Sequence, residues 1–186
     1  MGIPNVRANG IPRPPPLPST DDAEGGSRIT IGKKTPEVEA FWQKARKAKG
    51  IQTNDYIAST FADPQFSTKV DYISGLAAEG VKRGTCHMAL DFEVTGVKRR
   101  NPGDYWVVVD SKNTPLAVVR ITKVEVRPFN EIGEEFSSVE NEGDGSFKYW
   151  YDGHLGFFQR QCAAWGKEWR MDAPCVCESF DLIYKP

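Results

Sequence analysis

The sequence carries almost no excess charge and no long apolar run. Among its 186 residues, 24 Lys and Arg are balanced by 25 Asp and Glu, which leaves a formal net charge of −1. This balance excludes a histone-like polycation. No stretch approaches the roughly 18 consecutive apolar residues of a membrane span, and the first residues lack the apolar core and cleavage site of a secretory signal. We therefore expect a cytoplasmic protein without a membrane segment.

Cysteine is scarce, with four residues in the chain. These are too few for a disulfide scaffold, and no C-x-x-C pair suggests a zinc ribbon or a thioredoxin-like site. We predict reduced thiols. Cys175 and Cys177 are two residues apart in a predicted strand and share one face; they form either a redox or metal pair or, as we favour, part of the core. The sequence predicts no cofactor and leaves the need for a divalent metal open.

Proline is concentrated at the start of the chain. Six of the 13 prolines fall within residues 1–28, where almost no apolar residue is available for a core. Such a segment gains too little from burial to offset the entropy of ordering. We interpret residues 1–28 as a disordered tail; the alternative is that Pro14 to Pro18 bind a partner domain as a polyproline helix. Residues 29–186 are predicted to form a single domain.

Four segments have helical patterns. A Thr-Pro-Glu sequence at residues 35–37 predicts the start of the first helix, because Thr can cap it and Pro suits its first turn, and Gly50 marks its end. A second helix is predicted over residues 67–79. A short acidic helix is expected at about 131–140, and a long one over 146–165. Aromatic and other apolar residues repeat every three or four positions along the long helix, which is the strongest periodic signal in the sequence.

Strand patterns occupy the middle and the end of the chain. Apolar and polar residues alternate from Thr85 to Glu93, which predicts a strand with two distinct faces. Residues 105–110 and 116–127 are rich in Val and Ile and flank a turn, so we expect them to pair as a hairpin. A last strand is predicted at 175–184. Because helices and strands do not alternate regularly, a Rossmann-type fold is disfavoured, and we predict an α+β fold in which amphipathic helices flank a small β-barrel.

The richest candidate site is the Gly-Val-Lys-Arg-Gly-Thr segment at residues 80–85. It lies where a helix is followed by a strand, and it puts the amine of Lys82 and the hydroxyl of Thr85 three residues apart. An amine beside an apolar wall can lose its proton easily and act as a base toward the hydroxyl. The eight-residue spacing of a P-loop is missing. The alternative interpretation is an ordinary helix end followed by a surface lysine.

Acidic residues gather just before the long helix. Glu140, Glu142 and Asp144 lie within five residues of one another, where carboxylates suit the positive end of the helix dipole. They can equally orient a nearby amine, donate a proton to a leaving group or bind a divalent ion. His154 lies on the apolar stripe of the long helix, a position more typical of a core or cleft-edge residue than of a ligand. His87, the other histidine, has no evident partner.

A basic triplet lies between two predicted strands. Lys98, Arg99 and Arg100, together with Arg83 from the candidate site, can hold a phosphate backbone, and the nearby Trp106 can stack on a base. The alternative is a solvated turn. We predict these four basic side chains as contacts to a nucleic acid.

A series of short motifs runs from about Val38 to Tyr184. In chain order they are Gly80-x-Lys82-x-x-Thr85, Pro102-Gly103-Asp104, Val124-x-Val126-x-Pro128-Phe129, the segment from Glu140 to Ser146 followed by Tyr149-Trp150, His154 and Phe157-Phe158, and Pro174-x-Val176-Cys177-Glu178-x-Phe180. In this order the motifs resemble the ASCH domain family, most closely its longer bacterial members. Each motif alone is short, but the series together makes the resemblance specific.

The resemblance implies a PUA-like β-barrel with a cleft that faces RNA or a nucleoside. It also implies two activities, namely cleavage of single-stranded RNA and hydrolysis of the acetyl amide of N4-acetylcytidine, while other members of the family are described only as RNA-binding. The amide hydrolases of the family use a Lys, a Thr and a Glu. These correspond here to Lys82, Thr85 and Glu140, with Glu142 as the alternative carboxylate.

From the resemblance we expect an RNA-directed protein. Ribonuclease activity comes first, N4-acetylcytidine amidohydrolase activity is the alternative, and a non-catalytic RNA-binding module is the third possibility. Amide hydrolysis needs a neutral Lys82 as base toward Thr85, whereas RNA cleavage needs a charged Lys82. Ser146, Tyr149 and His154 are further candidates for catalysis or substrate binding. The expected partner is single-stranded RNA or a modified nucleoside, and the oligomeric state is left open.

Overall fold

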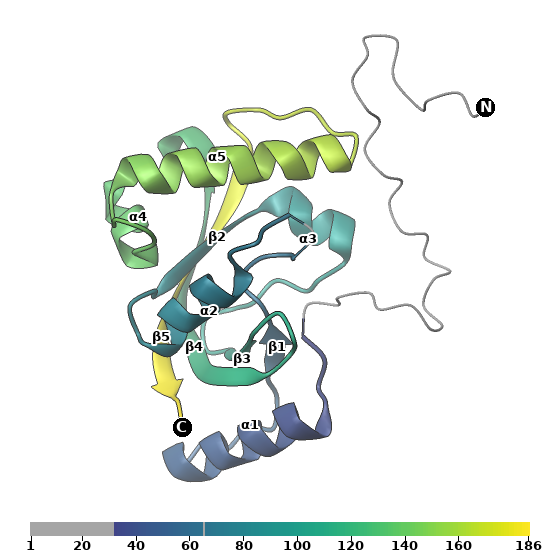
Figure 1. Cartoon of the computed structure of the whole chain (residues 1–186), viewed down its shortest axis with the longest axis vertical. Coiled ribbons are helices and arrows are strands. Elements are labelled where there is room, and N and C mark those ends of the chain that lie inside the picture. The colour runs from purple at the N-terminus through teal and green to yellow at the C-terminus, as the bar shows by residue number, and fades with distance from the viewer. Residues whose placement is uncertain (1–31, 65) are drawn as a thin grey trace, which may run out of the picture.

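The computed structural model describes residues 32–64 and 66–186, which form one sheet with helices around it (Figure 1). Within these residues five strands are hydrogen-bonded in the order β1-β3-β4-β5-β2. β1 and β3 are parallel, and all other neighbours are antiparallel. The strands are β1 (Ile57–Ser59), β2 (Gly84–Met88), β3 (Tyr105–Val109), β4 (Pro115–Pro128) and β5 (Pro174–Tyr184).

The long pair of β4 and β5 gives the sheet its curvature. The pairing register shifts at two places along β4, between Val118 and Val119 and between Ile121 and Lys123. Extra residues of this kind bend a strand and increase its twist. The sheet is therefore curled into a half-barrel, and the predicted α+β fold with a PUA-like barrel is confirmed.

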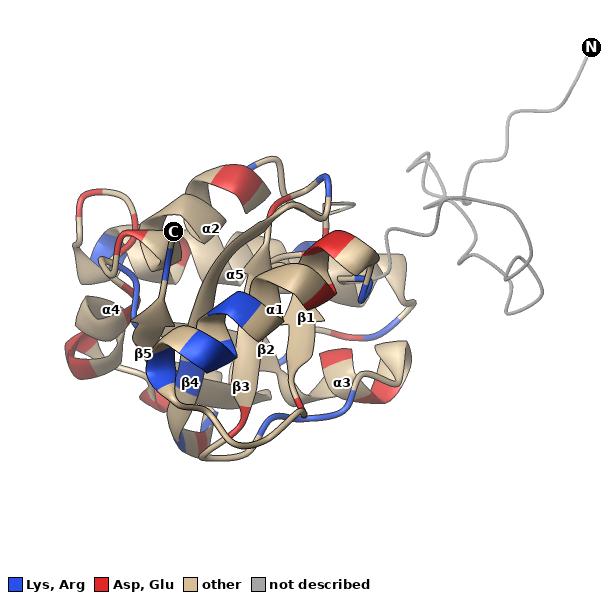
Figure 2. Ribbon diagram, turned by 90° about the horizontal axis from the view of Figure 1, so that it is seen from below, with Lys and Arg blue, Asp and Glu red and all other residues tan. Residues whose placement is uncertain are grey.

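Five α-helices in the described part of the chain surround the sheet. In Figure 1, α5 lies across one end of the molecule, α1 lies at the opposite end, and α2 lies between them. The side chain of Thr35 caps α1, and that of Ser146 caps α5 by accepting the backbone N–H of Tyr149 at 3.1 Å. The basic last turn of α1 is on the surface (Figure 2). The helices are α1 (Pro36–Lys49), α2 (Val70–Ala78), α3 (Ala89–Thr95), α4 (Glu134–Glu140) and α5 (Phe147–Ala164), with a short 3₁₀ helix η2 (Phe129–Glu131).

Apolar side chains form three clusters that follow the sheet. One lies beneath α5 and contains Phe129, Trp150 and Phe158. A second packs α1 against the sheet through Trp42. The third includes Trp106 and lies between them. The first and third clusters lie on either side of the chain segment that carries the candidate site.

The strand predicted from Thr85 to Glu93 is too long. β2 ends at Met88, and the chain continues directly into α3. The reason is the length of its partner: Met88 pairs with Cys175, next to the first residue of β5, so the following residues have no backbone groups to pair with. The three-residue strand β1 was not predicted, because a segment this short carries no period.

The remaining predicted elements lie within a few residues of the observed ones. The predicted tail at residues 1–28 lies outside the described residues. Among residues 32–64 and 66–186, no helix combines the length and apolar character needed to cross a bilayer. All four cysteines are free thiols, as predicted, and they are buried.

Candidate functional site

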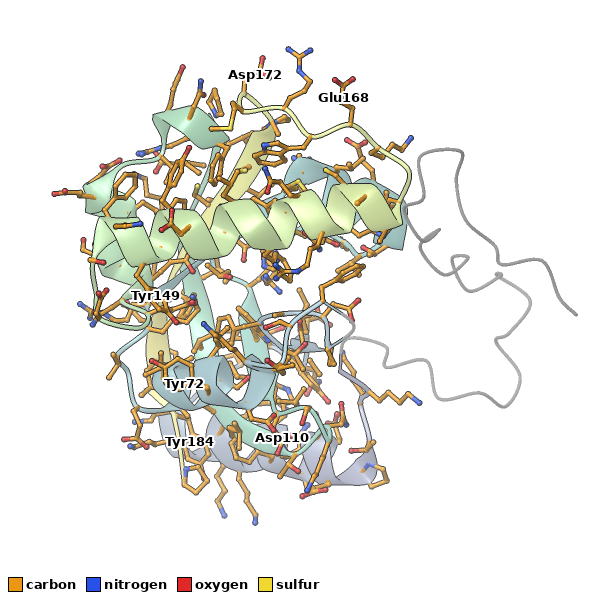
Figure 3. All side chains as sticks on the ribbon, turned by 45° about the horizontal axis from the view of Figure 1, so that its top comes forward. Tyr72, Asp110, Tyr149, Glu168, Asp172 and Tyr184 are labelled. Carbon is orange, nitrogen blue, oxygen red and sulfur yellow. The ribbon has the colours of Figure 1, made fainter. Side chains whose placement is uncertain are left out.

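A cavity of about 540 Å³ lies between α5, the start of α2 and strand β2. Its walls include most of the residues that the sequence singled out. Tyr149 projects from the first turn of α5 toward the side of the molecule where α2 and Tyr72 lie (Figure 3). The predicted site residues that line the cavity are Lys82, Thr85, Glu140, Glu142, Tyr149 and His154.

Lys82 is held between two carboxylates inside this cavity. Its Nζ donates to Glu140 Oε2 and to Glu142 Oε1, each at 2.5 Å. The Lys82 side chain is 1% exposed, that of Glu140 is 1% exposed and that of Glu142 is 13% exposed. The sequence analysis left open which glutamate belongs to the site, and the structure brings both to the same amine.

Two turns bring together the triad of Lys82, Glu140 and Glu142. Gly80 ends α2 with φ +74°, and the backbone N–H of Lys82 then donates to Leu76. After α4, Asn141 reverses the chain with φ +46°, so that Glu140 and Glu142 approach Lys82 from two sides. The backbone of Arg83 donates to Val139, which fixes α4 beside the start of β2.

Glu140 has further partners in α5. Its Oε1 accepts the indole N–H of Trp150 at 3.0 Å, and Nε2 of His154 lies 3.4 Å from the same oxygen. His154 also places Nδ1 at 2.9 Å from the carbonyl oxygen of Trp150. Because every neighbour of Glu140 is a donor, we assign it the role of anchoring the cations rather than of donating a proton.

The ion pairs fix the charges of the site. Burial lowers the pKa of Lys82, but Glu140 and Glu142 outweigh it and raise that pKa above the usual 10.5. Burial likewise raises the pKa of Glu140, yet Lys82 and His154 bring it well below its ordinary value. For His154, burial lowers the pKa, and Glu140 with Glu142 raises it above 6.5. The two ion pairs therefore favour the ammonium form of Lys82 over the neutral base that amide hydrolysis was expected to need.

The hydroxyl of Thr85 is the candidate nucleophile of the cavity. Thr85 belongs to β2 and is 4% exposed. Its neighbour Cys86 also lines the cavity, but burial and hydrogen bonds with Cys175 and Cys177 raise the pKa of the Cys86 thiol well above 9.0. A thiol that stays protonated is a poor nucleophile. Ser67 and Thr68 also line the cavity, but Thr85 is the buried hydroxyl on the same segment as Lys82.

Aromatic rings and two cations complete the cavity wall. Phe61 and Phe157 contribute rings, and Lys82 Nζ lies 5.3 Å from the ring centre of Phe61. Lys69, just before α2, donates to the Tyr149 hydroxyl at 2.8 Å, and Arg160 of α5 lies farther along the wall. Phe157 belongs to a motif noted in the sequence, whereas Phe61, Lys69 and Arg160 were not singled out, because they are far apart in the chain and belong to no common pattern.

The predicted RNA contacts are not gathered at the cavity. Arg83 is exposed, and Lys98 and Arg99 are exposed on the loop after α3, which is blue in Figure 2. Arg100 is 4% exposed and pairs with Glu178. Ser146 caps α5 and is not part of the cavity wall. Arg100 and Ser146 thus have partners within the chain, and the contacts to RNA stay a prediction.

No group of three His, Cys, Asp or Glu side chains in residues 32–64 and 66–186 is arranged to hold a metal ion. Two of the acids nearest the cavity centre, Glu140 and Glu142, are occupied by Lys82.

Two solved structures are similar to this chain. An ASCH domain from Lactobacillus crispatus JV V101 superposes with a TM-score of 0.71 at 24% identity, covering 81% of this chain and 96% of that one. Protein EF3133 from Enterococcus faecalis V583 gives a TM-score of 0.69 at 28% identity, covering 79% of this chain and 88% of that one. No curated protein shows a significant match. The family model of the ASCH domain matches residues 58–184, a segment that contains β2 to β5 and Lys82, Glu140 and Glu142, and the chain belongs to the ASCH domain family.

Proposed function

We propose that this protein hydrolyses the exocyclic amide of a modified nucleoside of the N4-acetylcytidine type. The observation that carries the proposal is the Lys82 ammonium, held by Glu140 and Glu142 beside the cavity-lining hydroxyl of Thr85. Together these residues supply a nucleophile and a fixed positive charge, which acyl transfer requires.

The size of the cavity supports a small substrate. Sites for small molecules typically enclose about 300–1,000 Å³, and this cavity measures about 540 Å³. Lys82 and Glu140 are both almost fully buried, so a substrate must enter the cavity to reach them. A nucleoside satisfies this requirement.

The charge of the cavity favours a neutral reacting group. Around Lys82, the ammonium contributes one positive charge, Glu140 and Glu142 contribute two negative charges, and a protonated His154 brings the sum of these four groups to zero. Lys69, Arg160 and Asp152 are the other charged side chains of the wall. A phosphodiester at Lys82 would meet both carboxylates, and like charges at short range repel strongly. An amide carries no charge and avoids this repulsion.

The side chains then have separate roles. Thr85 Oγ attacks the acyl carbon, and the Lys82 ammonium stabilises the negative charge that forms on the acyl oxygen. The carbon–nitrogen bond breaks, and the leaving nitrogen takes a proton from the His154 imidazolium. Water then releases the acyl group from Thr85. In this scheme Lys82 acts through its charge and not as a base, which agrees with its two ion pairs.

Cleavage of single-stranded RNA, which we expected first from the sequence, is the second candidate. It is supported by the charged state of Lys82 and by the cations Lys69 and Arg160 in the cavity wall. In such a reaction the neighbouring 2′-hydroxyl of the RNA is the nucleophile, so Thr85 is not required. This difference separates the two candidates experimentally.

The test is a mass-spectrometric time course with N4-acetylcytidine and a single-stranded RNA oligomer in the same tube. We expect the wild type to release cytidine and acetate. Thr85→Val has nearly the same shape without the hydroxyl and should lower the rate by at least about 100-fold, because the nucleophile is lost. The matched control is Thr122→Val, at an exposed position of β4, which should retain full activity.

The other outcomes assign the function differently. Shortened RNA with both the wild type and Thr85→Val, and no cytidine, replaces the proposal by ribonuclease activity. If the protein binds RNA, added salt weakens this binding and no product forms, the result supports a non-catalytic RNA-binding module. Hydrolysis of N4-acetylcytidine at the same rate by Thr85→Val retains the activity but overturns the assigned nucleophile.

A further inference from the structure

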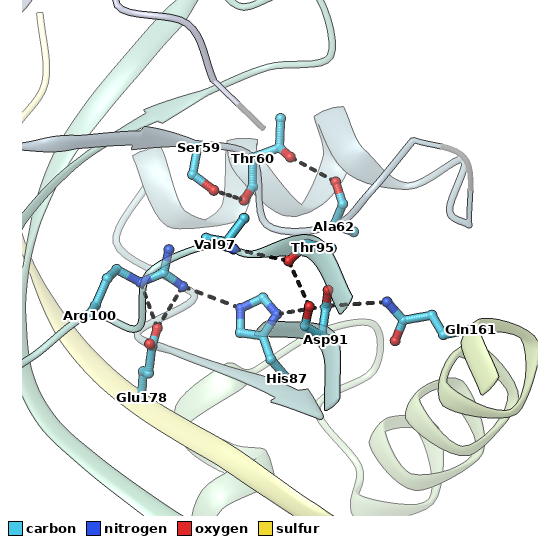
Figure 4. Close-up of polar contacts among 10 residues, drawn as sticks. All are labelled: Ser59, Thr60, Ala62, His87, Asp91, Thr95, Val97, Arg100, Gln161 and Glu178. Carbon is cyan, nitrogen blue, oxygen red and sulfur yellow. Dashed lines mark hydrogen bonds and ion pairs between the residues drawn. The ribbon is translucent and has the colours of Figure 1, made fainter. Parts of the chain in front are cut away.

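A second polar cluster lies on the sheet next to the cavity (Figure 4). At its centre Arg100 donates to Glu178 Oε2 through Nε at 2.8 Å and through Nη2 at 2.7 Å. Arg100 Nη2 also lies 3.3 Å from Nε2 of His87, and the guanidinium covers the ring of Trp106 at 4.0 Å. No role in the proposed reaction has yet been given to these residues.

Glu178 is the unusual member of this cluster. Its side chain is fully buried in β5, and while Oε2 is held by Arg100, Oε1 has no hydrogen-bond partner among the described residues. A buried carboxylate oxygen that accepts nothing is rare and costly. Such an atom points to a donor that reaches it in another state of the site.

The nearest strand provides that donor. Thr85 of β2 is the direct register partner of Glu178 in the antiparallel pair. Side chains of directly opposed residues lie on the same face of a sheet, with Cβ atoms about 4.5–5.5 Å apart, and a Glu side chain is long enough to span this gap to a Thr hydroxyl. Thr85 lines the cavity and Glu178 lies behind it.

We propose that Glu178 accepts the proton of the Thr85 hydroxyl when Thr85 attacks the substrate. This inference rests on the proposed function and completes it, because Lys82, as an ammonium ion between two carboxylates, has no free lone pair. Arg100 is then a positioning residue that holds the second oxygen of Glu178. His87, which lines the cavity and contacts Arg100, positions Arg100 in turn.

With these groups, every proton that moves in the reaction has a donor and an acceptor. As the bond from Thr85 Oγ to the acyl carbon forms, its proton moves to Glu178 Oε1, and the leaving nitrogen takes a proton from His154 as the carbon–nitrogen bond breaks. Water then attacks the ester, giving its proton to His154. The bond to Thr85 Oγ breaks, and Oγ recovers its proton from Glu178. The products are the free amine and the carboxylic acid, and all three side chains return to their first state.

An activated ester tests this step without the natural substrate. p-Nitrophenyl acetate transfers its acetyl group to an activated hydroxyl and releases p-nitrophenolate, so the rate is read by absorbance and the acetylated residue by peptide mass. We expect acetylation of Thr85 in the wild type. Glu178→Gln keeps the shape but cannot take a proton, and should slow acetylation by about 100-fold or more. The matched control is Glu125→Gln on the surface of β4, which should react at the wild-type rate.

A stability measurement separates chemistry from folding. The thermal unfolding of each variant is followed in parallel, and only cooperatively folded protein is compared. Should Glu178→Gln fail to fold, the double variant Arg100→Met/Glu178→Leu replaces it, because removing both members of a buried ion pair leaves no unpaired charge. The double variant should also lose the acetylation of Thr85.

The outcomes separate this inference from the proposed function. Acetylation of Thr85 that depends on Glu178 supports the inference even if N4-acetylcytidine is not a substrate. A folded Glu178→Gln that acetylates Thr85 or hydrolyses N4-acetylcytidine at the wild-type rate overturns it, while the proposed function then stands. Absence of Thr85 acetylation in the wild type also overturns it.

Discussion

Lys82 shows how the meaning of one residue depends on its neighbours. Lys82 and Thr85 line one cavity, but the sequence pattern allowed Lys82 to be a neutral base or a permanent cation. Two carboxylate oxygens, each 2.5 Å from Lys82 Nζ, favour the cation. Separating opposite charges inside a buried site requires far more free energy than in water. Residues 58 and 60 positions away along the chain thus determine the chemistry of Lys82.

His154 should make the stability of the protein depend on pH. Burial opposes its charge, but Glu140 and Glu142 raise the folded-state pKa above the unfolded value near 6.5. The contribution of this ion pair is therefore complete below pH 6.5 and is lost as the pH rises through the folded-state pKa. In urea unfolding, the difference in free energy between the wild type and His154→Gln should be larger at about pH 6 than at about pH 9. An equal difference at both values would contradict the charged state assigned to His154.

At the scale of elements, the site depends on how closely α4 approaches β2. Gly84 makes this approach possible: a Cβ atom built there would lie 2.9 Å from Val139 Cγ1 and 3.1 Å from the carbonyl oxygen of Glu178. The same Cβ would lie 3.6 Å from Cγ of Glu140. Any side chain at position 84 must push α4 outward, and Glu140 moves with it.

Gly84→Ala should therefore destabilise the protein and disturb the ion pair of Lys82. We expect a loss of about 1–3 kcal/mol in the free energy of unfolding, the usual effect of overpacking. The control is Gly75→Ala in α2, where a new Cβ meets nothing within 4 Å and a gain of about 0.5–1 kcal/mol is expected from helix propensity. Urea unfolding measures both, and a Gly84→Ala protein as stable as Gly75→Ala would refute the close packing of α4 on β2.

Local patterns predicted most elements but not their limits. The caps at Thr35 and Ser146 and the stripe of α5 are local signals, and the structure confirms them. The end of β2 was missed because it depends on where β5 begins. Glu178 was noted only as part of a motif, and its position opposite Thr85 depends on a strand register that no single segment encodes. An acid within the apolar first half of β5 was the available signal.

At the scale of the whole molecule, the cavity wall is built from segments that are far apart in the sequence. Its wall takes residues from the loop before α2, from β2, from the end of α4 and from α5. A ligand in the cavity contacts parts of the chain that are far apart in sequence, so it binds the folded state and not the unfolded chain. Binding and folding are therefore linked.

A nucleoside product should stabilise the protein measurably. Cytidine at about 100 times its dissociation constant should add about 2.7 kcal/mol to the free energy of unfolding. Thermal unfolding at increasing cytidine concentration measures this effect, with the exposed-position variant Thr122→Val expected to follow the wild type. A transition that does not move at any cytidine concentration would argue against a nucleoside site.

The pairing of β2 with β5 has a consequence for the order in which the site is made. Lys82 and Thr85 come early in the chain, while Glu178 lies 78 positions after its partner Arg100. During synthesis the nucleophile thus leaves the ribosome long before the opposing strand exists. Until β5 joins β2 and β4, Thr85 faces no carboxylate and Arg100 has no counter-ion. On our proposal, the transfer of the Thr85 proton therefore requires that β5 has taken its place in the sheet.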